Sequence, residues 1–133
     1  MRTLAEFVSC LVAALLFFIF SPALTVAAQA PILSEAQYAR DWCQKEQGRI
    51  VRLPGAPLPI CELAEYRVAV AFAENWAATI GGAYFATIDS ARKMGAALIF
   101  RAPGDQQYWN LLNRAAIKHH LPIRTWVIQP IQP

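Results

Sequence analysis

The chain contains few of the side chains that most often carry catalysis. Its 133 residues include only two histidines and three cysteines. The histidines, His119 and His120, are neighbours, and neighbouring side chains on a helix point about 100° apart, so they do not form a shared metal-ligand face. Their predicted role is a favourable positive charge at the end of a helix.

Two familiar motifs and a strong net charge are also missing. The sequence has neither a Gly-x-Ser-x-Gly nucleophile motif nor a glycine-rich phosphate-binding loop, the features that indicate serine hydrolases and P-loop proteins. The formal net charge is +3, whereas dedicated nucleic-acid binders usually carry far more cationic patches. Contact with an anionic surface is permitted by this charge but is not predicted by it.

Only one long apolar run is present, from Leu11 to Phe20, and it lies near the N-terminus. Arg2 precedes it, and Ala28-Gln29-Ala30 has the small-x-small form of a signal peptidase site. Residues 1–30 are therefore predicted to be a secretory signal peptide. The alternative is a retained anchor helix, because the apolar character is nearly long enough to span a membrane.

Cleavage after Ala30 would leave residues 31–133, which is enough for one small α/β domain. Such a domain would be periplasmic or secreted, with no stable membrane span of its own. Its two cysteines, Cys43 and Cys61, have seventeen residues between them. An even number of cysteines in a small exported domain favours a disulfide, although two buried free thiols are the alternative. A metal site is disfavoured because no histidine lies near either cysteine.

The pattern of apolar and turn residues predicts an α-β-β-β-α-β-α-β order. Ser34-Glu-Ala-Gln37 is a capping-box form that should begin a helix. Two short apolar runs around a Pro/Gly turn indicate a hairpin, and the later segments alternate strands with amphipathic helices. The predicted ranges are helix 34–45, strands 49–53 and 58–63, strand 67–73, helix 74–93, strand 96–100, helix 105–120 and strand 123–129. This order implies a mixed sheet flanked by helices.

The apolar pattern also predicts which sides of these elements are buried. The strand Arg67 to Ala73 alternates large and small apolar residues, which suits burial on both faces. In the following helix Trp76, Ile80, Tyr84 and Ile88 are expected to form one apolar stripe. In the last helix, Tyr108, Leu111, Leu112 and Ala115 are expected to face inward.

The order and several local motifs resemble the restriction-endonuclease-like, or PD-(D/E)XK, nuclease superfamily, whose core is αβββαβ. Within it the chain is similar to a small exported bacterial group. The matching motifs are Asp41-Trp42-Cys43, Cys61, the VAVAFAENWAATIG segment, the strand MGAALIF and the ending LPIRTW. The resemblance covers nearly the whole of residues 31–133, and it implies such a core followed by a helix and a final strand.

The resemblance also implies where the catalytic groups of the family would fall. It places an acidic residue at position 60, a glutamate at 69, a polar group at 71, and a Gln-x-x-x-Tyr pair at 82 and 86. This chain has Ile60, Ala69, Ala71, Gly82 and Ala86 at those positions. A hard cation such as Mg²⁺ needs oxygen ligands, and none of these side chains supplies one. The resemblance therefore implies a pseudoenzyme without a cofactor.

Two alternatives place function elsewhere in the domain. Glu62, Glu65 and Glu74 lie around one strand and are candidates for a relocated Mg²⁺ site in an active exported nuclease, although solvated surface glutamates are the usual explanation. A set of cations is a candidate for nucleic-acid backbone contacts, with scattered solvated charges as the alternative. Its members are Arg92, Lys93, Arg101, Arg114 and Lys118.

A third hypothesis is a partner-binding module, membrane-anchored if the signal is retained, that uses exposed aromatics such as Trp109 or Trp126. The favoured hypothesis from sequence is nevertheless an exported, non-catalytic protein with a binding or structural role. The sequence names neither its ligand nor its partner.

Overall fold

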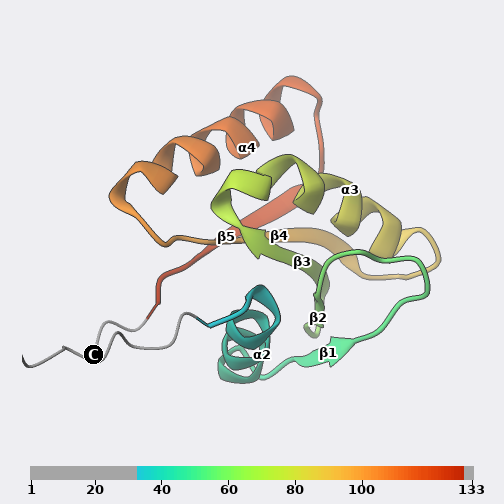
Figure 1. The fold of residues 1–133 in the computed structure, drawn as a ribbon. Coiled ribbons are helices and arrows are strands. Elements are labelled where there is room, and N and C mark those ends of the chain that lie inside the picture. The colour runs from blue at the N-terminus through green and yellow to red at the C-terminus, as the bar shows by residue number, and fades with distance from the viewer. Residues whose placement is uncertain (1–32, 131–133) are drawn as a thin grey trace, which may run out of the picture. The chain divides into compact units, whose positions relative to one another are not determined.

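A five-stranded mixed sheet has one helix on one face and two helices on the other (Figure 1). The computed structural model describes residues 33–130, and the predicted signal peptide lies outside them. The sheet order is β1-β2-β3-β4-β5. The elements are α2 (Glu35–Lys45), β1 (Arg49–Val51), β2 (Ile60–Glu62), β3 (Tyr66–Phe72), η1 (Ala73–Asn75), α3 (Trp76–Thr87), β4 (Lys93–Ile99), η2 (Pro103–Asp105), α4 (Gln106–Lys118) and β5 (Ile123–Ile128).

The directions of the strands follow from the connections between them. β1, β2 and β3 pair antiparallel through short loops, whereas β3, β4 and β5 pair parallel. Each parallel connection contains a helix, as a crossover between parallel strands requires. The predicted mixed sheet with flanking helices, and the predicted order of its elements, are confirmed.

Helix α2 begins and ends with local motifs that satisfy its terminal backbone groups. Ser34 and Gln37 form the predicted capping box. At the other end Gln47 adopts a left-handed conformation with φ of 60°, and the backbone N–H of Gly48 donates to the carbonyl of Cys43. This is the pattern of a Schellman motif. A Cβ at Gly48 would lie 2.6 Å from Leu63, so only glycine permits this close approach to the sheet.

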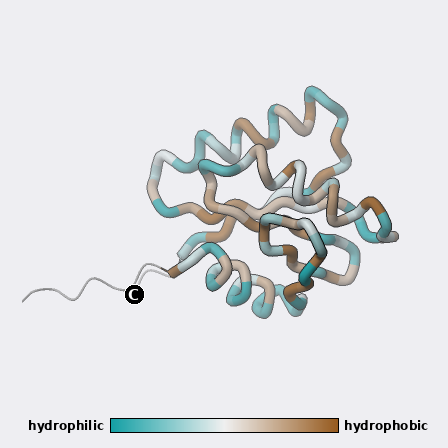
Figure 2. The backbone as a smooth tube through the Cα atoms, turned by 45° about the vertical axis from the view of Figure 1, so that its right-hand side comes forward, coloured by the Kyte–Doolittle hydropathy of each residue, from teal (hydrophilic) through white to brown (hydrophobic). Residues whose placement is uncertain are grey.

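The alternation in β3 separates two different packing faces. Val68 and Val70 pack against α2, in a core that also contains Ala39 and Trp42. Ala69 points to the opposite face, where α3 and α4 lie. Figure 2 shows apolar and polar segments alternating along the helices that cover the sheet. The predicted burial of this strand on both faces is confirmed.

The predicted apolar stripe of α3 is wrong in its second half. Tyr84 and Ile88 are 63% and 60% exposed, while the buried residues of this helix are small. Side chains four apart are rotated by about 40° from one another, so the expected stripe turns away from the sheet as the helix proceeds. The helix also ends at Thr87, earlier than predicted, and β4 begins at Lys93. The buried residues are Thr79, Gly82, Ala83 and Ala86.

Helix α4 is confirmed as an element, but its buried face is partly different from the prediction. Leu112 is buried as expected, and Ala116 is the other buried residue, whereas Ala115 is only half-buried. The helix ends in a second Schellman motif in which His120 has φ of 52° and the N–H of Leu121 donates to the carbonyl of Ala116. Both histidines therefore lie at the end of the helix, where the sequence placed them.

A disulfide joins Cys43 of α2 to Cys61 of β2, with 5.7 Å between the Cα atoms. The predicted disulfide is thus confirmed, and it attaches α2 to the hairpin. At the opposite end of α2 the Glu35 carboxylate accepts a hydrogen bond from the backbone N–H of Phe72 at 2.9 Å. Among the residues that the structure describes, no helix is long and apolar enough to cross a membrane.

Candidate functional site

The positions that the nuclease resemblance singles out lie together on the α3 side of the sheet. Ile60 of β2 is the direct antiparallel partner of Ala69 of β3, and directly opposite residues in a sheet have their side chains on the same face. Both side chains are completely buried. They belong to one apolar cluster that also contains Ala86 of α3.

Helix α3 covers this pair through its smallest side chains. A Cβ at Gly82 would lie 3.1 Å from the Cβ of Ala69 and 3.4 Å from Leu58, so the helix backbone is close to the strand. Ala71, which lies two residues after Ala69, is also completely buried. The space between the strand and the helix is therefore filled by apolar packing, and the five positions carry no side-chain oxygen.

The three glutamates that were candidates for a relocated metal site do not come together. Glu62 and Glu65 lie near the start of β3, whereas Glu74 follows its end, about 20 Å away at the usual rise of a strand. Glu65 pairs with Lys93 at 4.0 Å, and Glu74 pairs with Arg101. Within residues 33–130, no group of three or more histidine, cysteine, aspartate and glutamate side chains is placed to hold a metal ion.

Glu62 is not a solvated surface glutamate, because its side chain is only 3% exposed. Its Oε1 accepts hydrogen bonds from Nε and Nη2 of Arg49 at 3.0 and 2.6 Å. Its Oε2 accepts from Nε of Arg67 at 2.9 Å, and Nη2 of Arg67 lies at the same distance. Nη1 of Arg92 is 3.4 Å from Oε2. Three guanidinium groups thus surround one buried carboxylate.

These arginines hold Glu62 in its charged form. The hydrogen bond from Arg49 lowers the pKa of Glu62 below its ordinary value of 4.5, burial acts in the opposite direction, and Arg67 and Arg92 add to the lowering. A metal ion at this carboxylate would have to approach three positive charges. We therefore interpret Glu62 as the centre of an ionic cluster, hereafter the Glu62 cluster, made of Glu62, Arg49, Arg67 and Arg92.

The five cations that were candidates for nucleic-acid backbone contacts lie in different places. Arg92 belongs to the Glu62 cluster, and Lys93 begins β4 beside it. Arg101 follows the other end of β4, and its guanidinium lies 3.9 Å from the centre of the Phe72 ring. Arg114 and Lys118 are exposed on α4. The five do not form one continuous basic surface, because Arg92 and Arg101 lie at opposite ends of the parallel strands.

The two tryptophans proposed as exposed aromatics are half-buried, so that expectation is wrong. Trp126 makes edge-to-face contacts with Trp42 and Tyr66, with ring centres 6.0 and 5.4 Å apart. The indole N–H of Trp109 is buried without a hydrogen-bond partner among the described residues. The large apolar side chains that are exposed are Tyr84, Phe85, Ile88 and Ile117.

Arg49 and Arg67 are members of the cluster that the sequence analysis did not single out. The signal that identifies them is the strand register, which pairs Arg49 with Glu62 and Glu62 with Arg67. The hairpin was predicted, but its register was not. Side chains of opposite charge at directly opposite positions of three adjacent strands would have indicated the cluster.

The fold and the Glu62 cluster define a disulfide-bonded α+β protein with a mixed five-stranded sheet. Comparisons of the chain with protein-family models, curated proteins and solved structures found no significant match.

Proposed function

We propose that this chain is an exported, non-catalytic binding protein, periplasmic or secreted, built on a restriction-endonuclease-like arrangement of elements. The observation that carries the proposal is the buried pairing of Ile60 with Ala69 under Gly82 of α3. An active site for Mg²⁺-dependent hydrolysis would need carboxylates there to seat the cation and generate hydroxide. Aliphatic side chains close the space instead.

The disulfide supports the exported location, because such bonds persist in oxidising compartments. The predicted signal peptide at residues 1–30 agrees with this location. An ionic cluster with three arginines and only one carboxylate supports a binding role, since it leaves positive charge at the surface.

The proposal predicts that the purified protein does not cleave nucleic acid. Plasmid and single-stranded DNA are incubated with the protein and Mg²⁺ or Mn²⁺, and the products are separated on a gel. We expect no more cleavage than in reactions with a chelator. Metal-dependent cleavage that is lost in Glu62→Gln or Glu74→Gln would contradict the proposal and favour the relocated nuclease site.

A restoration experiment tests the placement of the site. The double variant Ile60→Asp/Ala69→Glu should take up a divalent cation weakly, measured by calorimetry, because the two new carboxylates would lie side by side on adjacent strands. Burial of two carboxylates is costly, so circular dichroism must first show that the variant is folded. A folded double variant that binds no cation would count against the proposed nuclease-like site, whereas wild-type protein is expected to bind none.

A further inference from the structure

The Glu62 cluster contains more positive charge than its carboxylate can neutralise. Three guanidinium groups face one carboxylate, so the cluster carries a formal surplus of two positive charges. No second carboxylate among the described residues pairs with these arginines. Glu65, the next acidic residue along the chain, is paired with Lys93 instead.

The Glu62 carboxylate can form its hydrogen bonds without the third arginine, Arg92. A carboxylate has about four lone-pair positions, and two N–H groups of Arg49 and two nitrogens of Arg67 already approach them within 3.0 Å. Arg92 is at 3.4 Å and contributes positive charge beyond this saturated set. Its charge is therefore available to a further anion.

Two of the three guanidinium groups are held in position by neutral backbone carbonyls. Nη1 of Arg67 donates to the carbonyl of Ala86 at 2.9 Å, and Nε of Arg92 donates to the carbonyl of Leu63 at the same distance. Because carbonyls carry no full charge, these contacts fix the arginines without cancelling their charge. Nη1 of Arg49 and Nη2 of Arg92 have no partner among the described residues.

A shallow hollow of about 380 Å³, widely open to solvent, lies beside the cluster at the edge of the sheet where α2 ends. Arg49 and Arg92 line it, and the Arg49 side chain is 77% exposed whereas that of Arg92 is 36% exposed. The glycine at position 48 forms another part of its wall. The hollow thus offers free N–H donors and surplus positive charge on the same surface. Glu62 also lines it, and the hydrogen bonds from Arg49 and Arg67 neutralise its carboxylate.

We propose that this hollow is a binding site for a tetrahedral oxyanion, a phosphate or sulfate group, held by Arg49 and Arg92 with Arg67 supporting them through Glu62. The fork of N–H groups on arginine matches the oxygens of such an anion, and hydrogen bonds between charged groups are the strong ones. The site adds a ligand class to the proposed binding role. The anion-binding inference rests on the proposed function only for its biological meaning.

Binding is measured with inorganic phosphate, inorganic sulfate and glycerol phosphate added to the disulfide-bonded protein at constant ionic strength. Calorimetry gives the affinity, and the NMR signals of the arginine Nε–H groups report the location. We expect saturable binding that shifts the Nε–H signals of Arg49 and Arg92. Tighter binding of glycerol phosphate than of inorganic phosphate would identify a phosphate ester as the ligand, and the reverse would identify the free ion.

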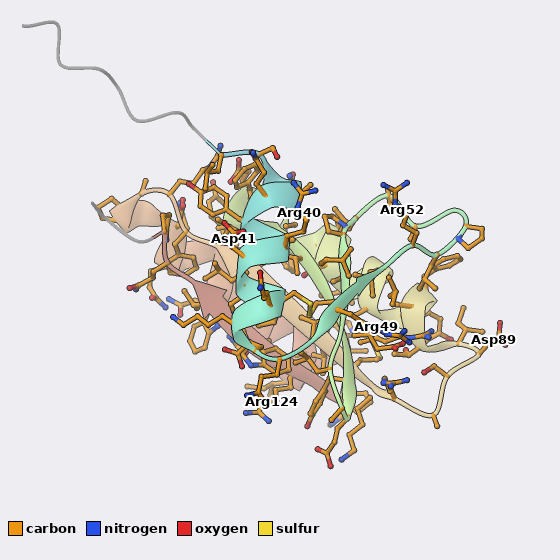
Figure 3. The ribbon with its side chains drawn as sticks, turned by 90° about the horizontal axis from the view of Figure 1, so that it is seen from below. Arg40, Asp41, Arg49, Arg52, Asp89 and Arg124 are labelled. Carbon is orange, nitrogen blue, oxygen red and sulfur yellow. A yellow bond between two sulfur atoms is a disulfide. The ribbon has the colours of Figure 1, made fainter. Side chains whose placement is uncertain are left out.

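The variants Arg49→Gln and Arg92→Gln should each weaken binding by about tenfold, the usual effect of one charged hydrogen bond. Arg52→Gln is the matched control, because it removes the same charge from an exposed residue that has no ionic partner among the described residues. Figure 3 shows Arg52 apart from Arg49, farther along the hairpin. The affinity of the Arg52→Gln variant for the anion should stay within about twofold of that of the wild type.

Two results would overturn the inference: no saturable binding of any of the three anions by folded wild-type protein, or equal weakening by Arg52→Gln and Arg92→Gln. The second result would indicate attraction to general surface charge. The anion-binding inference and the proposed function can be contradicted independently. Cleavage of DNA by the protein would contradict the proposed non-catalytic function, but the anion-binding measurements would remain valid. Absence of anion binding would leave the cleavage and metal results unchanged.

Discussion

At the scale of single residues, Glu62 shows how environment decides the role of a side chain. The residue is a glutamate on a short strand, and such residues are normally solvated. Here it is buried, and three arginines from β1, β3 and the loop before β4 surround it. Removing one member of a buried ionic cluster leaves the others without compensation, which is more costly than losing a surface pair.

We predict that Glu62→Gln lowers the free energy of unfolding at pH 7 by about 3 kcal/mol. Because the pKa of Glu62 is lowered in the folded protein, the stabilisation is fully present above the ordinary value of 4.5. It is lost as the pH falls through the folded-state pKa, since the unfolded chain binds the proton first. Urea denaturation from pH 7 to pH 3 should show a steeper loss for wild type than for Glu62→Gln.

Glu65→Gln is the control for this measurement, because Glu65 belongs to an exposed pair at 4.0 Å. Exposed pairs contribute about 0–1 kcal/mol, so this variant should retain the stability and the acid dependence of wild type. If Glu62→Gln behaved like Glu65→Gln at every pH, the ionic cluster would have no net role in stability.

At the scale of elements, α3 packs through its small residues and leaves large ones exposed. The two adjacent glycines in this helix have different surroundings. A Cβ at Gly81 would meet nothing within 4 Å, whereas one at Gly82 would lie 3.1 Å from the Cβ of Ala69. Only the second glycine is therefore explained by close approach of the helix to the sheet.

The two glycines make a matched pair of variants. Gly81→Ala should raise the free energy of unfolding by about 0.5–1 kcal/mol, because alanine is the better helix former. Gly82→Ala should lose that gain or become destabilising, because the buried strand must shift to admit the new methyl group. Thermal unfolding measures both. Equal stabilisation by the two substitutions would show that α3 is free to move away from β3.

At the scale of the whole molecule, one disulfide joins α2 to β2, a strand that lies between β1 and β3 in the sheet. The bond lies in the core on the α2 face of the sheet, beside Trp42 and Val68. It restricts the unfolded chain between two cysteines 18 positions apart, and closing a loop of that size contributes roughly 3 kcal/mol in the chain-entropy model.

Reduction should therefore lower the free energy of unfolding by roughly 3 kcal/mol. Denaturation is measured with and without reductant, and Cys43→Ala/Cys61→Ala is the control, since reductant should not affect it. Unchanged stability of the wild type under reductant, with the thiols shown to be free, would exclude this role for the disulfide.

The sequence by itself determined the kinds of elements and their order, because these depend on local signals. It also determined the disulfide, because only two cysteines follow the predicted signal peptide. The capping box at Ser34, the Pro/Gly turn of the hairpin and the alternation in β3 act within a few residues. The same signals predicted a mixed α/β sheet, and the structure has one.

Only the tertiary structure decided which face of α3 is buried and which charges meet. The apolar stripe predicted through Tyr84 and Ile88 was wrong. Helix α3 lies close to the sheet, and the small side chains on its buried face permit this short distance between helix and strand. The Glu62 cluster depends on strand register and on a residue thirty positions later, Arg92. A local pattern contains no information on such contacts, because charge pairing acts between residues that the fold brings together.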